Sequence, residues 1–95
     1  MNRRTKLKLR LYVAGDAQNS ASAVANLKEI CKVHMPGRCE LEIVDVFREP
    51  KRALADGIFM TPTLVKLSPS PARRIVGTLS QIEPVLQLLG LQAAA

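Results

Sequence analysis

The sequence has 95 residues, of which 47% are hydrophobic and only 3% aromatic, and its formal net charge is +6. This length suits one domain and not two, and the few aromatics predict a core of Leu, Val, Ile and Ala. No apolar run approaches the ~20 residues that cross a bilayer, and the basic start at 1–4 lacks the apolar stretch of a signal peptide. We therefore expect a cytoplasmic protein with one domain over 1–95 and a core over about 6–90.

Residues 6–13 alternate strictly between polar and apolar side chains, which is typical of a strand with one buried face. The apolar set is predicted to face the core: Leu7, Leu9, Leu11 and Val13. The other set is predicted to face outward or to meet a partner: Lys6, Lys8, Arg10 and Tyr12. Gly15 and Asp16 supply turn chemistry after this strand.

A helix is predicted next, from about Asn19 or Ser20 to Met35. Asn19 or Ser20 could cap its first turn. Apolar residues recur in it at three- and four-residue spacing: Val24, Leu27, Ile30 and Cys31. The Pro-Gly pair at 36–37 should end the helix.

The second strand is predicted over 39–46. Leu41 and Ile43 should point to one face, and Val44 and Val46 to the other, which favours a strand covered on both sides. A strand, a helix and a second strand indicate a right-handed βαβ unit with parallel strands.

A short helix should begin at Glu49-Pro50, since Pro suits a first turn, and should end at Gly57. Strands are then predicted over 63–67 and 72–76, joined as a hairpin by the Ser-Pro-Ser-Pro turn at 68–71.

The last predicted helix follows Ser80, which forms a capping-box pattern with Glu83, and it should end at Gly90. Its apolar stripe is predicted to contain Ile82, Val85, Leu86 and Leu89.

This order, β-α-β-α-β-β-α, resembles the α/β thioredoxin-like fold. Pro62, between Thr61 and Thr63, stands where such folds place a cis-proline before the third strand. Thioredoxins carry C-x-x-C after the first strand, but the corresponding stretch here, 14–20, contains no thiol. The resemblance therefore implies the fold without its redox chemistry.

Five motifs in register resemble the KaiB family of circadian-clock proteins, over about Leu7 to Leu89. They are Leu-Tyr-Val-Ala-Gly at 11–15, Asn-Ser at 19–20, Val-Asp-Val at 44–46, Thr-Pro-Thr-Leu at 61–64 and Arg-Arg-Ile-Val-Gly at 73–77. The KaiB-like sensor domain of a clock histidine kinase shares the fold, but the first and last motifs look more like KaiB.

The resemblance implies a non-enzymatic regulator without a cofactor. Such a protein docks on KaiC, a hexameric ATPase, and shifts its phosphorylation state; KaiA or a histidine kinase are further partners. The candidate partner contacts are Lys66, Pro71, Arg73 and Arg74. Basic residues also protect strand edges from aggregation, so the Arg pair has a purely structural alternative.

The family resemblance also implies a metamorphic protein, with a tetrameric state whose second half folds differently from the thioredoxin-like state. By ungapped counting, the family's Gly-x-Asp step falls on Leu88-Leu89-Gly90, so Leu88 replaces a Gly and favours helix by about 1 kcal/mol. Leu88 and Gly90 are thus candidate fold-switch residues, and we expect this chain to favour the thioredoxin-like form. A homodimer or homotetramer remains open.

Two other functions stay as alternatives. The +6 charge would suit nucleic acid, but only Tyr12, Phe47 and Phe59 could stack bases, and no RNP-like or GXXG motif is present. A degenerate redox enzyme would have to use Cys31, which is predicted inside a helix. With Cys31, Cys39 and His34 as the plausible soft ligands, no metal site is expected.

Overall fold

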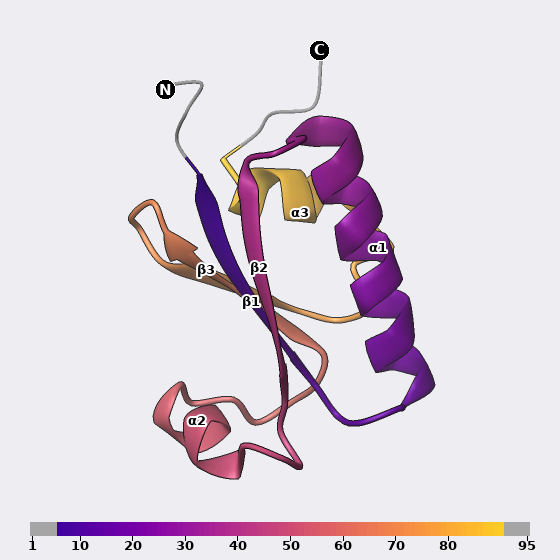
Figure 1. Cartoon of the computed structure of the whole chain (residues 1–95), viewed down its shortest axis with the longest axis vertical. Coiled ribbons are helices and arrows are strands. Elements are labelled where there is room, and N and C mark those ends of the chain that lie inside the picture. Colours follow the sequence, from indigo (N-terminus) through magenta and orange to yellow (C-terminus); the bar gives the residue numbers. More distant parts are fainter. Residues whose placement is uncertain (1–5, 91–95) are drawn as a thin grey trace.

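The central strand β1 (Leu7–Val13) organises a four-stranded mixed sheet in a computed structural model that describes residues 6–90 (Figure 1). The strand order is β2-β1-β3-β4, with β1 parallel to β2 and antiparallel to β3, and with β3 antiparallel to β4. The remaining elements are α1 (Gln18–His34), β2 (Cys39–Asp45), α2 (Pro50–Ala55), β3 (Thr63–Ser68), β4 (Arg73–Val76) and α3 (Ile82–Leu88). The predicted β-α-β-α-β-β-α order is confirmed.

One face of the sheet is covered by α1 and α3 and forms what we call the large core. The odd-numbered residues of β1 pack there, as predicted, together with Leu27 of α1 and Val85 of α3. Leu64 of β3 joins them because it pairs with Leu11 on the same face. The apolar side chains that alternate along the strands therefore pack in one layer with those that recur at helical spacing in α1 and α3.

The opposite face carries a smaller cluster under α2, which we call the small core: Tyr12, Val44, Ala53, Ile58 and Val65. Tyr12 points to this face, as the alternation predicts, but it is fully buried and not outward-facing. The prediction of an exposed tyrosine was wrong because α2 and its following loop cover this end of β1.

Two predictions for the first half need correction. The N-cap of α1 is Ala17 with no side-chain cap, and Ser20 instead lies inside the helix, where its hydroxyl accepts a hydrogen bond from the Ala14 N–H at 3.0 Å. Strand β2 is an edge strand, and Ile43 is 41% exposed, so that strand is not covered throughout on both sides.

The last helix also differs in detail from its prediction. The capping box is absent: Gln81 is the N-cap without a side-chain hydrogen bond. Ile82 is 44% exposed, whereas Leu88 is buried with Val85, Leu86 and Leu89. Gly90 follows the C-cap Leu89 with φ +79°, the left-handed conformation that ends a helix, as predicted.

Candidate functional site

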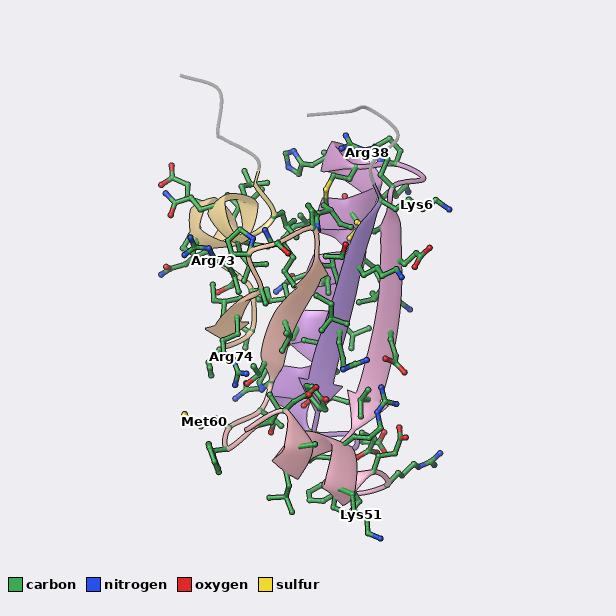
Figure 2. The ribbon with its side chains drawn as sticks, turned by 90° about the vertical axis from the view of Figure 1, so that its left-hand side faces the viewer. Lys6, Arg38, Lys51, Met60, Arg73 and Arg74 are labelled. Atoms are coloured by element: carbon green, nitrogen blue, oxygen red, sulfur yellow. The ribbon has the colours of Figure 1, made fainter. Side chains whose placement is uncertain are left out.

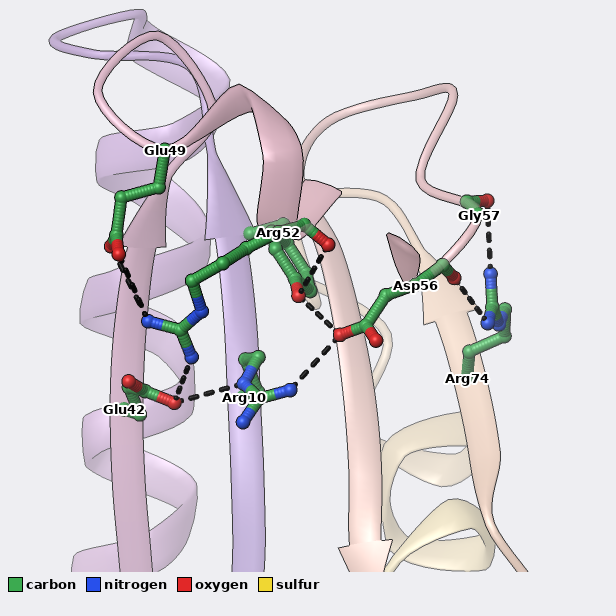
Figure 3. A network of polar contacts seen from close by, with 8 residues as sticks. Arg10, Glu42, Glu49, Arg52, Asp56, Gly57 and Arg74 are labelled. Carbon is green, nitrogen blue, oxygen red and sulfur yellow. Dashed lines mark hydrogen bonds and ion pairs between the residues drawn. The ribbon is translucent and has the colours of Figure 1, made fainter. Parts of the chain in front are cut away.

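The carboxylate of Asp56, the C-cap residue of α2, ties that helix to β1. It accepts hydrogen bonds from the Tyr12 hydroxyl and from Arg10 Nη1, the latter at 2.9 Å (Figure 3). The Tyr12 bond, followed by that from Arg10, lowers the pKa of Asp56, while burial raises the pKa of Tyr12. Asp56 is therefore held as an anion against a neutral phenol and a guanidinium.

A second carboxylate extends this network toward the edge strand. Glu42 Oε1 of β2 accepts from Arg52 Nη2 and from Arg10 Nε, each at 2.8 Å (Figure 3). These two guanidinium groups lower the pKa of Glu42 to about 2. Arg52 also contacts Glu49 at 3.2 Å within the first turn of α2. Arg10 of β1 and Arg52 of α2 thus both bind Glu42 of β2, and these ion pairs connect the three elements.

Arg74 of β4 reaches the end of α2 and does not project freely. Its Nη2 donates to the Asp56 carbonyl at 2.8 Å, and its Nη1 donates to the Gly57 carbonyl at 3.2 Å. Carbonyls at a helix C-terminus lack intrahelical donors, so a guanidinium is well matched to them. Arg10, Tyr12 and Arg74 therefore all donate hydrogen bonds to Asp56, and Arg74 also donates one to Gly57.

The structure does not gather the four predicted contact residues on one surface. Arg73 and Arg74 are both exposed, but they alternate in β4 and lie apart in Figure 2, Arg73 beside α3. Arg73 pairs with Lys66, which is only 6% exposed and has little surface to offer a partner. Pro71 is exposed in the β3–β4 turn. Pro62 is buried, and its peptide bond with Thr61 is cis.

Arg73 lines an open groove of about 420 Å³ between β4 and α3. The other lining residues are Arg74, Ile75, Pro84, Gln87 and Leu88. This groove offers the two guanidinium groups of Arg73 and Arg74 beside apolar and amide side chains, which suits contact with a polar protein surface.

Large apolar side chains are exposed around α2, and we call this set the α2 apolar surface: Phe47, Leu54, Phe59 and Met60. Their exposed fractions run from 64% for Met60 to 88% for Phe59. Phe47 lies beside Gly15, so this end also includes the turn after β1, where thioredoxins carry their thiols. Figure 2 shows Met60 and Lys51 at this end of the molecule, away from Lys6 and Arg38.

Chemistry-bearing groups are sparse in the described residues. Within 6–90, no cluster of three or more His, Cys, Asp or Glu side chains has a metal-binding arrangement. Cys31 and Cys39 are free thiols that are both partly buried, and burial raises the pKa of both, that of Cys31 to about 12. None of the helices in this part of the chain has the length and apolar character needed to span a bilayer.

Sequence reasoning missed the network around Asp56 and the α2 apolar surface. Asp56 lies just before Gly57, where the short helix is predicted to end, and neither it, Glu42 nor Arg52 belongs to a recognisable motif. One signal was available: Phe59-Met60 is an apolar pair that falls in a loop and not in a predicted strand or helix. Exposed pairs of this kind indicate binding surfaces.

Comparison with known proteins identifies relatives over most of the chain. The family model described as KaiB domain matches residues 10–91. Circadian clock protein KaiB3 from Synechocystis sp. is 43% identical over 86 residues, which is 90% of this chain and 82% of the relative. Circadian clock oscillator protein KaiB from Synechococcus elongatus is 47% identical over 78 residues, or 82% of this chain and 76% of the relative.

Solved structures support the fold. The N-terminal domain of Synechococcus elongatus SasA matches with a TM-score of 0.73 and 23% identity, covering 96% of this chain and 90% of that domain. Chloroplastic thioredoxin z matches with a TM-score of 0.71 and 22% identity, covering 92% and 81% respectively. The predicted thioredoxin-like fold is confirmed.

Proposed function

The chain belongs to the KaiB family, and from that membership we propose that it is a cytoplasmic, non-enzymatic regulator that docks on a KaiC-type hexameric ATPase and modulates its phosphorylation state. KaiA or a histidine kinase are proposed as further partners. Relatives over this much of the chain are circadian clock proteins, which supports a role in a clock or a related timing system.

The observation that carries the docking proposal is the α2 apolar surface. Four large apolar side chains lie exposed within the stretch 47–60, although each would gain free energy by leaving water. Clustered exposure of this kind is typical of protein-binding surfaces. Arg48 and Lys51 are also exposed there, so we propose a partner surface that is apolar at its centre and acidic at its rim.

The two arginines have different proposed roles. Arg73 is exposed beside α3 and is proposed to contact the partner directly, together with Pro71. Arg74 is proposed as a positioning residue, because its guanidinium is bonded to the Asp56 and Gly57 carbonyls that end α2. Lys66 remains a predicted contact, with only 6% of its surface exposed.

The decisive experiment removes the α2 apolar surface and measures the dissociation constant with a KaiC-type ATPase by calorimetry. Leu54→Ser with Phe59→Ser should weaken binding more than tenfold, or more than about 1.4 kcal/mol. The matched control is Val33→Ser, which removes an apolar side chain that is 59% exposed on α1. Equal binding by the double variant and the wild type would refute docking through this surface.

Charge reversal at the arginines separates the two proposed roles. Arg73→Glu with Arg74→Glu should also weaken binding more than tenfold. Arg74→Lys keeps the charge but loses the bidentate hydrogen bonds to the Asp56 and Gly57 carbonyls. Because these bonds position the end of α2, this variant should weaken binding as well. Arg73→Lys should bind nearly as the wild type. Normal binding by Arg74→Lys would instead make Arg74 a simple charge contact.

We also propose that Leu88 and Gly90 set the balance between the thioredoxin-like form and an alternative tetrameric fold. Leu88 is buried in the large core at the last position of α3, and Gly90 ends that helix. Both features support the thioredoxin-like form. The nucleic-acid alternative loses one of its three stacking candidates, since Tyr12 is fully buried.

A further inference from the structure

Two cationic side chains start from directly opposed positions in strands β3 and β4. Lys66 and Arg73 are partners in the register of this antiparallel pair, which places their Cβ atoms about 5 Å apart. Leu64 and Ile75 lie two residues away along the same strands, and they pack in or against the large core. Because side chains two residues apart share a face, Lys66 and Arg73 lie on the large-core side, and Figure 2 shows Arg73 beside α3.

No carboxylate compensates this pair of charges within residues 6–90. The ion pairs of that range have Arg10, Arg48 and Arg52 as their cations. Neither Lys66 nor Arg73 makes a side-chain hydrogen bond or an ion pair with a described residue. Like charges directly opposite each other destabilise a sheet, so a bound anion would stabilise the protein at this point.

Lys66 is the buried member of the pair. It is 6% exposed, and no other charged side chain in the described part of the chain is buried to this extent. Every fully buried side-chain nitrogen or oxygen there has a hydrogen-bond partner, so the unpartnered Lys66 ammonium reaches water while its stem packs beneath. Strand β3 lies between β1 and β4, so the protection of a sheet edge, which is an alternative role for the Arg pair, does not explain this lysine.

The groove between β4 and α3 gives a ligand access to this pair. Arg73 lines it together with Gln87, whose side-chain amide makes no hydrogen bond to another described residue. Ile75, Pro84 and Leu88 supply apolar walls, and the described lining contains no carboxylate that would repel an anion. A guanidinium and an amide therefore lie at the groove, with the Lys66 ammonium next to the guanidinium in the sheet.

From this arrangement we propose that Lys66, Arg73 and Gln87 bind a phosphate group, carried by inorganic diphosphate or by a nucleoside diphosphate. Near neutral pH such a group carries about two negative charges and three acceptor oxygens, which match two cations and an amide donor. The planar Arg73 guanidinium suits two of the oxygens, and Lys66 acts as a point charge. A carboxylate, with one charge and two oxygens, would compensate the pair only in part.

The test titrates the full chain with sodium pyrophosphate at constant ionic strength, by calorimetry and by thermal unfolding. We expect binding of one diphosphate per chain and a rise in Tm. Lys66→Met with Arg73→Gln should weaken this binding more than tenfold. The charge-matched control, Lys51→Met with Arg48→Gln, removes two exposed cations near α2 and should bind as the wild type. Equal losses in the two double variants would mean general attraction to a basic chain and would overturn the proposal, as would a wild type that does not bind.

A second measurement needs no ligand. Lys66→Met keeps a side chain of similar volume and removes the charge opposite Arg73, so it should raise the Tm of the anion-free chain. A lower Tm would show that the fold already compensates Lys66 and would contradict the proposal. ADP in place of pyrophosphate separates the two sources: equal affinity indicates a site for the phosphates alone, and tighter binding of ADP indicates a nucleotide site. Both measurements use the isolated chain, so a chain that binds pyrophosphate but no KaiC-type ATPase would leave this proposal standing.

Discussion

The two faces of the sheet are stabilised in different ways. Within residues 6–90, the large core contains fourteen buried apolar residues under α1 and α3, whereas the small core contains five under α2. The α2 side adds a set of hydrogen bonds and ion pairs that link α2 to the neighbouring strands, made by Arg10, Glu42, Arg52, Asp56 and Arg74. Apolar burial is thus the main contact on the α1 and α3 face, whereas directional polar contacts are prominent on the α2 face.

This contrast offers a reason why the proposed docking surface remains exposed. A short helix attached by apolar packing alone would need to bury Leu54, which is 70% exposed. Because polar contacts attach α2 through its C-cap and through Arg52, Leu54 can stay exposed to solvent. The geometry of these contacts also fixes the direction in which α2 presents them.

The largest expected effect is on the large core. Leu11→Ala removes a fully buried side chain from the central strand and should lower the free energy of unfolding by about 2–5 kcal/mol. Leu67→Ala, in β3 and 39% exposed, is the control and should cost less than about 1 kcal/mol. Urea unfolding followed by circular dichroism measures both. Similar losses for the two variants would mean that burial does not separate these positions.

The next effect concerns Leu88. Leu88→Gly removes a side chain from the large core and adds about 1 kcal/mol of helix penalty, so the thioredoxin-like form should lose about 2 kcal/mol or more. We expect the population to shift toward an alternative fold or a tetramer, detected by NMR and light scattering. Leu88→Ala, which keeps the helix propensity, should shift it less. A monomeric thioredoxin-like Leu88→Gly variant would contradict the proposed switch.

On the α2 side, Asp56→Asn should cost about 1–3 kcal/mol. The substitution removes the charge that holds the Tyr12 hydroxyl and Arg10 Nη1 while keeping the shape of the side chain. Asp16→Asn, at an exposed position, is the matched control and should change little. Chemical denaturation at neutral pH gives the comparison, and a cost no larger than that of Asp16→Asn would show that the network does not hold α2.

Acid should weaken the α2 side before the large core. The folded-state pKa of Glu42 is lowered from 4.5 to about 2, and that of Asp56 is also lowered. Their contribution is therefore complete above the ordinary carboxyl pKa and is lost as pH falls from about 4.5 toward 2. Both groups are partly exposed, so the effect is modest. Combining Glu42→Gln with Asp56→Asn should flatten this slope in urea titrations between pH 5 and 2.

The sequence predicts the large core better than the α2 side for a physical reason. Leu7, Leu9 and Leu11 follow a local two-residue period, which needs no knowledge of distant segments. The contacts of the Asp56 carboxylate join residues more than forty positions apart, and Tyr12 looks like an outward-facing position until α2 covers it. Short polar signals were also misleading, since neither Ser20 nor Ser80 caps its helix.

The predicted partner contacts remain a prediction, but their surroundings could not be read from the sequence for a similar reason. Family resemblance directed attention to Arg73 and Arg74 as a pair, but only Arg74 is bonded to the end of α2. The burial of Lys66 depends on packing that its own sequence neighbours do not reveal. The alternation of faces along β1 was predictable, whereas the loops that cover or expose a residue were not.

The smallest expected effect separates the two kinds of apolar residue on the α2 side. Phe59→Ser should change the free energy of unfolding by less than about 0.5 kcal/mol, because Phe59 is 88% exposed and gives little to either core. Ile58→Ser, one residue earlier, should cost more than about 2 kcal/mol, because Ile58 is 8% exposed within the small core. Thermal and urea unfolding of both variants would measure the difference. A large loss for Phe59→Ser would place Phe59 in the folding of the α2 side and remove the main reason for treating it as a docking residue. A negligible loss means that water-exposed Phe59 is not required by the fold, so its presence at this end needs an explanation outside the isolated chain, and a partner surface provides one.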